Sequence, residues 1–226
     1  LSLAKEADKV PIPDRGPLHG LPVAPKDAVA VKGFPTTLGY KPFADRIEVN
    51  DDLLAARLRL AGAIFIGHTN MPEFGLGSNT FNSVFGTTSN PYDLTKSAGG
   101  SSGGAAVALA TDMLPLADGS DMGGSLRNPA SFCNVVGFRP SIGRMPKGLG
   151  AAWYGRLSTT GPMAKTVKDT AFLMSIISGE DNTDPLTLNQ SGNDFLEAFT
   201  PYKILKDRPL KIKSLDIEIS NEEKKN

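Results

Sequence analysis

The sequence predicts an α/β layer structure, in which strands and helices alternate along one chain. Two observations carry this prediction. Short apolar runs of strand length lie between segments with helical apolar spacing, and Gly- or Pro-rich turns separate them. At 226 residues, the chain is long enough for one good-sized core or at most two small ones. We therefore expect strands covered by helices around a common core.

Apolar periodicity places the elements of the first half of the chain. In order, they are a helix end over Leu1–Asp8, short strands around a turn over Leu21–Val31, an amphipathic helix over Asp51–Leu60 and a short buried strand over Ala61–Gly67. Asp51 and Asp52 stand at the start of the predicted helix, where carboxylates interact favourably with the helix dipole.

The second half continues the alternation. Its expected elements are a long polar loop over Met71–Pro91, a small-residue helix over Gly104–Thr111, a buried strand over Met113–Ala117, a helix over Thr166–Ser178 and a strand over Leu210–Ile219. The last segment, Ser220–Asn226, has no apolar residue, so we expect a disordered tail.

Composition excludes several classes of function. The formal net charge is zero, with 24 basic and 24 acidic residues, which gives no electrostatic case for binding nucleic acid or an anionic membrane. The single cysteine, Cys133, excludes an internal disulfide and fits a reducing compartment. No apolar run approaches the ~20 residues of a membrane span. We therefore predict a cytoplasmic protein that binds neither nucleic acid nor membrane directly.

Two Gly/Ser clusters, Gly99–Gly104 and Asp121–Arg127, point to chemistry. Glycines allow tight turns, and a serine in such a turn is a hydroxyl set among exposed backbone amides. Acyl transfer needs such a nucleophile together with amides that form an oxyanion hole. Ser125 is the candidate nucleophile, because it closely follows a predicted strand and two glycines precede it. The amides expected to face the oxyanion belong to Met122, Gly123, Gly124 and Ser125.

A serine nucleophile needs a base, and histidine is scarce here. Only His19 and His68 exist, and neither has a neighbouring carboxylate in the sequence, although a Ser-His-Asp triad stays open. Lys26 is the alternative, because residues 21–25 before it are apolar. Burial lowers the pKa of a lysine by up to ~3–5 units, which makes the amine a useful base near neutral pH. If the carboxylate of Asp27 met the amine, the lysine would stay charged and fail as a base.

Together these segments resemble the amidase signature family of serine hydrolases. Gly99–Gly104 and Asp121–Arg127 match the signature, and Gly20–Asp27 matches the lysine element of the family. Two positions depart from the pattern: Ala98 stands where the family usually has Pro, and Pro25 stands where a branched aliphatic residue is common. Neither residue carries a catalytic group, so we expect activity to survive both changes.

The resemblance implies a role for each site residue. Ser125 is the nucleophile, and Ser101, whose preceding peptide bond is expected to be cis, relays the proton of Ser125 to Lys26. Ser102 supports this triad. Asp121 and Arg127 are expected to form an ion pair behind the nucleophile turn.

The resemblance also implies a fold and an activity. The fold is a mixed central β-sheet covered by helices, in one domain over residues 1–219 with its core over 16–178, truncated at both ends relative to the family. The activity is hydrolysis of a small-molecule carboxylic amide to an acid and an amine or ammonia, through an acyl-enzyme on Ser125 and with no metal or organic cofactor. A homodimer, or a second chain, is expected to supply the missing C-terminal part.

Other interpretations stay open at this point. One is the glutamine-hydrolysing component of a tRNA-dependent amidotransferase. Those relatives usually carry Ser-Leu-Asp where Leu157–Thr160 stands, which favours a free-standing amidase. Another is a catalytically impaired fragment. A phosphate-binding loop at Gly99–Gly104 is disfavoured, because the Gly-Lys-Ser/Thr ending is absent. Trp153 and Tyr154, in the aromatic segment Gly148–Tyr154, are expected to contact an acyl or aryl group.

Overall fold

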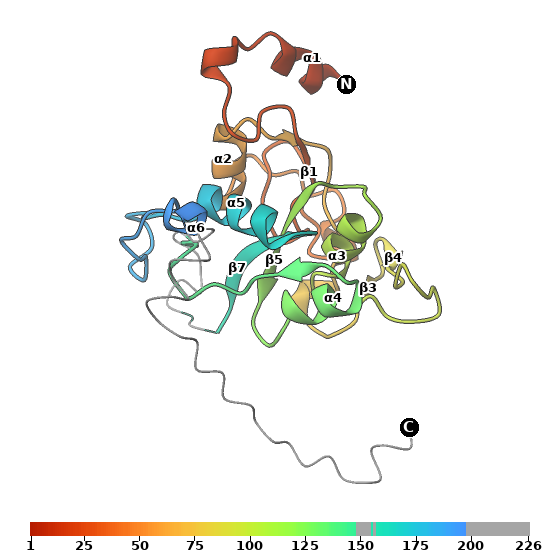
Figure 1. The fold of residues 1–226 in the computed structure, drawn as a ribbon. Helices are drawn as coiled ribbons and strands as arrows, with labels where there is room; N and C mark the ends of the chain where they lie inside the picture. Colours follow the sequence, from red (N-terminus) through yellow and green to blue (C-terminus); the bar gives the residue numbers. More distant parts are fainter. Residues whose placement is uncertain (148–154, 156, 198–226) are drawn as a thin grey trace, which may run out of the picture.

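The computed structural model describes residues 1–147, 155 and 157–197 (Figure 1). Its helices are α1 (Ser2–Asp8), α2 (Leu53–Leu60), α3 (Gly103–Ala110), α4 (Arg127–Phe132), α5 (Val167–Ile177) and α6 (Asp194–Glu197). Its strands are β1 (Pro22–Val23), β2 (Ile64–Phe65), β3 (Phe81–Asn82), β4 (Gly86–Thr87), β5 (Leu116–Asp121), β6 (Val136–Gly137) and β7 (Thr159–Ala164). Short 3₁₀ turns lie at Ile12–Asp14, Lys41–Phe43 and Glu73–Gly75.

The longest strand pairing joins β5 to β7. These two strands are antiparallel over six residue pairs, from Leu116 opposite Ala164 to Asp121 opposite Thr159, and β6 lies on the other side of β7. A separate parallel pair joins β1 to β2, and a hairpin joins β3 to β4. Parallel and antiparallel pairings therefore both occur, divided among three small sheets within the described residues.

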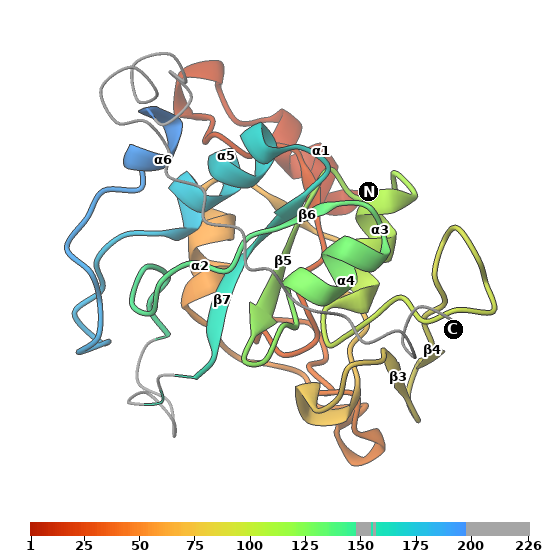
Figure 2. The ribbon, with the colours of Figure 1, turned by 60° about the horizontal axis from the view of Figure 1, so that its bottom comes forward.

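Both faces of the β5–β7 pair are buried, because successive side chains of a strand point to opposite faces. Leu116 and its partner Ala164 belong to one apolar cluster, with residues of α2, α5, β1 and β2. Ala117 and its partner Met163 belong to a second cluster, with residues of α3 and α4. Figure 2 shows α2 and α5 on one side of these strands and α3 and α4 on the other. This layering confirms the predicted α/β class.

Helix caps follow from local sequence. Asp52 accepts a hydrogen bond from the amide of Ala55 at the start of α2, and the hydroxyl of Thr166 accepts from the amide of Asp169 at the start of α5. Short polar side chains at this position satisfy amides that the first helical turn leaves free. The sequence predicts both helices within two residues of these bounds.

Two strands were predicted poorly: β7 was not predicted at all, and β5 was expected at other bounds. A strand was expected over Met113–Ala117, but it begins at Leu116 and continues to Asp121, so the first residue of the second Gly/Ser cluster belongs to the strand. Of the strands expected over Leu21–Val31, the structure has only β1. The predictions for Gly148–Tyr154, for Leu210–Ile219 and for the tail Ser220–Asn226 lie outside the described residues.

Candidate active site

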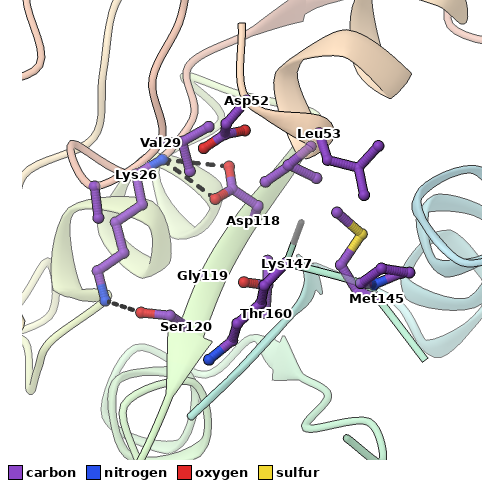
Figure 3. Close-up of a pocket in the computed structure, with 13 residues that line it drawn as sticks. Lys26, Val29, Asp52, Leu53, Asp118, Gly119, Ser120, Met145, Lys147 and Thr160 are labelled. Atoms are coloured by element: carbon purple, nitrogen blue, oxygen red, sulfur yellow. Dashed lines mark hydrogen bonds between the residues drawn. The ribbon is translucent and has the colours of Figure 1, made fainter. Parts of the chain in front are cut away.

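Lys26 lies just beyond β1 and is almost completely buried, with 1% of its surface exposed. A bridge to Thr69 holds its main chain beside the segment that follows β2. Its Nζ atom lies 2.7 Å from Ser101 Oγ, 3.0 Å from Ser102 Oγ and 3.0 Å from Ser120 Oγ. The three hydroxyls surround the amine, and Figure 3 shows the contact with Ser120.

Burial sets the ionisation of this amine. Loss of solvent lowers the pKa of Lys26 from 10.5 to about 7, and the charges of Asp118 and Asp121 oppose that shift only in part. Asp27 takes no part, because its carboxylate accepts hydrogen bonds from the amides of Thr37 and Gly39 and from the Thr37 hydroxyl. The Asp27 carboxylate therefore does not contact the Lys26 amine, and it does not hold that amine in its charged form.

Ser101 and Ser102 stand between the first glycine pair and α3. The Gly100–Ser101 peptide bond is cis, as the family resemblance implies, and both serines are buried. Gly119 on β5 lets Ser102 come close to the strand, since a Cβ built on Gly119 would lie 2.6 Å from Ser102 Oγ. Thr80 holds the other side of the turn, by donating to the carbonyl of Gly99.

Ser125 lies in the turn after β5 and is partly exposed. Its carbonyl oxygen accepts from the amide of Ser102 at 3.2 Å, so the two serine segments meet through the main chain. Among the described residues, no hydrogen bond joins the hydroxyls of Ser125 and Ser101. The structure thus brings Lys26 and Ser101 into direct contact and joins the Ser125 turn to Ser102 through the main chain.

The expected oxyanion amides need one correction. The amide of Gly124 donates to Asp121 Oδ1 at 2.8 Å, so the carboxylate already occupies this donor. A Cβ built on Gly123 would meet nothing within 4 Å, which shows that the turn is open there. The amides of Met122, Gly123 and Ser125 remain as the candidates.

Asp121 holds this turn by ion pairs and hydrogen bonds. Its fully buried carboxylate pairs with Arg127 at 2.9 Å, as expected, and with Arg139 at 3.0 Å, which the sequence did not indicate. Burial opposes the charged form. The hydrogen bonds from Arg127 and from the amides of Leu126 and Gly124 outweigh it, and the pKa of the Asp121 carboxyl falls below its usual range.

Two further site residues were missed from the sequence: Asp118 and Ser120, on β5. Both oxygens of Asp118 accept from the main-chain amide of Lys26 at 3.3 Å. Burial raises the pKa of the Asp118 carboxyl to about 7, and the nearby charge of Asp52 adds to the shift. The available signal was the spacing of Asp118 and Ser120 in the strand, since residues two apart face the same side.

A cavity of about 120 Å³ lies beside Lys26 (Figure 3). Asp52, Asp118 and Ser120 line one part of it, and Met145 and Lys147 lie across from them. Ser125 is not among the lining residues, so this cavity is adjacent to the proposed base rather than to the nucleophile.

Within residues 1–147, 155 and 157–197, no group of three or more His, Cys, Asp or Glu side chains could hold a metal ion. In the same part of the chain, no helix is both long and apolar enough to cross a bilayer. His68 Nδ1 lies 3.1 Å from the carbonyl oxygen of Pro25, away from any carboxylate contact that would orient it as a base. Cys133 is fully buried, and burial raises the pKa of its thiol to about 11.

Comparison with known proteins agrees with this geometry. The sequence profile of the amidase family matches residues 1–212. The chain belongs to the amidase family. The family assignment made on the Gly/Ser clusters is thereby confirmed, and so is the amidase signature fold.

Individual amidase relatives show how much of the family this chain covers. It is 45% identical to an acylamidase of Rhodococcus erythropolis, over 81% of this chain and 38% of the relative. It is 43% identical to a glutamyl-tRNA(Gln) amidotransferase subunit of Desulfatibacillum aliphaticivorans, over 88% of this chain and 41% of the relative. A bacterial aryl acylamidase structure superposes with a TM-score of 0.81 at 34% identity, covering 88% of this chain and 43% of that one. The chain thus spans about two fifths of the length of these amidases.

Proposed function

We propose that this chain carries the catalytic centre of an amidase that hydrolyses a carboxylic amide to an acid and an amine or ammonia. One observation carries the proposal: the buried amine of Lys26 lies 2.7 Å from the hydroxyl of Ser101. A neutral amine has a lone pair that can accept a hydroxyl proton. Burial makes that neutral form accessible near pH 7.

The proposed reaction begins at Ser125. Its Oγ forms a bond to the carbonyl carbon of the amide, while its proton passes to Ser101 Oγ and the proton of Ser101 passes to Lys26 Nζ. When the tetrahedral intermediate collapses, the C–N bond breaks and the leaving amine takes a proton back through Ser101. Water then attacks the acyl carbon and gives a proton to Lys26 through Ser101. The bond between the acyl carbon and Ser125 Oγ breaks, Ser125 takes the proton back by the same relay, and the acid leaves.

Backbone amides of the Ser125 turn are proposed to bind the oxyanion. The candidates are the amides of Met122, Gly123 and Ser125, whereas the amide of Gly124 helps Asp121 to hold the turn. Loss of one donor to an oxyanion typically costs ~3–4 kcal/mol of transition-state stabilisation. Asp121, with its two arginines, supports the turn without touching substrate.

The test is covalent labelling by a serine-directed fluorophosphonate, with the modified residue identified by peptide mass mapping. We expect the probe on Ser125, and we expect Ser125→Ala to abolish the labelling. Ser141→Ala, at an exposed serine, should label as the wild type does. Labelling that persists in Ser125→Ala would contradict the assignment.

A second candidate rests on the 43% identity to the glutamyl-tRNA(Gln) amidotransferase relative. In that role the same residues would release ammonia from glutamine for a charged tRNA, and the protein would work within a complex of several chains. Acylation of Ser125 by aryl or alkyl amides but not by glutamine would favour the free-standing amidase. Glutamine hydrolysis together with co-purification of partner proteins would favour the second role.

Partners and location belong to the same proposal. One relative is named as a subunit of an amidotransferase, so a second copy or a second chain is proposed to work together with this chain. Light scattering on the purified protein, with and without an amide substrate, measures this directly. The single cysteine favours a cytoplasmic location, which cell fractionation tests.

A further inference from the structure

A carboxylate that the proposed chemistry does not use lies directly beside the proposed base. Asp118 on β5 is 4% exposed, and each of its oxygens lies 3.3 Å from the main-chain nitrogen of Lys26. Two residues further along, Ser120 Oγ lies 3.0 Å from Lys26 Nζ. Because alternate residues of a strand face the same side, β5 contacts both ends of Lys26, as Figure 3 shows.

We propose that Asp118 is a positioning residue for Lys26, which holds the main chain of the base against β5 while its charge acts on the amine. The inference rests on the proposed function, since it assigns Asp118 to the same reaction. Lys26 needs such a contact, because β1 is only two residues long and ends at Val23. Beyond that strand, the bridge to Thr69 is the regular pairing at Lys26 in the described structure.

Asp118 has few other interactions to neutralise its charge. A buried carboxylate is usually paired with a cation or accepts several amides. Here the carboxylate accepts two long hydrogen bonds, both from the amide of Lys26. Burial raises the pKa of Asp118 to about 7, close to the pKa of Lys26, so the two groups lose protons over the same range and influence each other.

The charged and titratable groups around this pair come from several elements. They are Asp52 at the start of α2, Asp121 at the end of β5, Lys147 across the cavity, Asp27 next in the chain, and His68 against Pro25. Asp27 is held by Thr37 and Gly39, and Asp121 by two arginines. In the part of the chain that the structure describes, Asp118 is in no ion pair and accepts from the Lys26 amide, so removing its charge tests this pair without breaking an ion pair.

The experiment is an NMR titration of Lys26 in the full chain, labelled with ¹³C at lysine Cε and assigned with Lys26→Met. Asp118→Asn keeps an oxygen that accepts from the Lys26 amide and removes the charge. We expect the titration midpoint of Lys26 to fall by at least about half a pH unit in this variant. Asp112→Asn is the matched control, because Asp112 is exposed and pairs with Lys165, and it should leave the midpoint unchanged.

Labelling kinetics give a second readout. The acid limb of the fluorophosphonate labelling rate should move to lower pH in Asp118→Asn, in step with the NMR midpoint. Asp118→Ser provides a second neutral variant should the Asn variant not fold. A folded neutral variant whose Lys26 midpoint and acid limb both match the wild type would overturn this inference. Failure of the wild type to react at Ser125 would instead overturn the proposed function.

Discussion

Two carboxylates on one strand, Asp118 and Asp121, lie in opposite surroundings. Asp121 pairs with Arg127 and Arg139 and accepts two amide hydrogen bonds, whereas Asp118 accepts a single amide, that of Lys26. The pKa of Asp121 accordingly lies below the usual range of a carboxyl group, and burial raises that of Asp118 to about 7. Both are buried, so what distinguishes them is hydrogen bonding and charge pairing.

The difference divides the site into a fixed side and a titratable side. Around Asp121, strong charge pairing holds the Ser125 turn in one geometry over the whole physiological pH range. Around Lys26 and Asp118, burial with little charge compensation leaves groups that change protonation near neutral pH. A general base must change protonation during the reaction, so it belongs on the titratable side. The amides that bind an oxyanion must keep one geometry, so they belong on the fixed side.

The largest effect should come from removing the base. Lys26→Met should reduce the fluorophosphonate labelling rate by about 10²–10⁴-fold, the usual contribution of a positioned general base. Stopped-flow or gel-based labelling measures this. Lys165→Met, which removes an exposed lysine, should retain the wild-type rate. A Lys26→Met variant that labels at the control rate would place the base elsewhere.

The same variant also reports on stability. Folding lowers the pKa of Lys26 to about 7, whereas an unfolded lysine titrates near 10.4, so the unfolded chain binds more protons between these values. The contribution of Lys26 to the free energy of unfolding is therefore lowest below pH 7, and it increases as the pH rises toward 10. The thermal midpoint of Lys26→Met should exceed that of the wild type most at pH 6–7, and the difference should shrink by pH 10.

The next largest effect should come from the fixed side. Asp121→Asn breaks two ion pairs at a buried carboxylate, which should destabilise the fold by roughly 2–4 kcal/mol. Urea unfolding near pH 7 measures this loss. Because the pKa of Asp121 is depressed, its contribution is present above pH ~4 and disappears as the pH falls below that value. If the variant and the wild type had the same free energy of unfolding at pH 7, Asp121 would not support the Ser125 turn as proposed.

A smaller loss of stability should come from changing Gly119, which lies where β5 packs against Ser102 and Leu126. Gly119→Ala places a Cβ 2.6 Å from Ser102 Oγ and 2.7 Å from Leu126 Cδ2, so the serine segment must move away from β5. Overpacking of this kind typically costs about 1–3 kcal/mol. We expect a lower thermal midpoint together with slower labelling. Gly123→Ala, at a glycine whose built Cβ meets nothing within 4 Å, is the matched control for stability alone.

Local sequence and motif spacing were sufficient to predict several elements and part of the candidate site. Helices α2 and α5 followed from their apolar spacing, and α3 followed from its run of small residues. Lys26 followed from its apolar approach together with the family resemblance. These features depend on neighbours in the chain, which a single sequence displays. The Asp121–Arg127 pair was also predictable, because its members are six residues apart within one turn.

Long-range partners could not be found in that way. Asp118 and Ser120 meet Lys26 across 92 and 94 residues, through the packing of β5 against the segment after β1. The role of Gly124 depends on where the Asp121 carboxylate points, which is set by the turn as a whole. Contacts of this kind depend on tertiary packing, and neither apolar period nor motif spacing encodes them.

The proposed mechanism requires Lys26 to be a neutral base at physiological pH, and the titration of Lys26 itself tests this most directly. The measurement is the ¹³Cε chemical shift of Lys26 between pH 5 and 11 in the wild-type chain. We predict a midpoint near pH 7, as expected for an amine buried among three hydroxyls. A midpoint near 10.4, the value of a solvated lysine, would contradict the proposed role of Lys26.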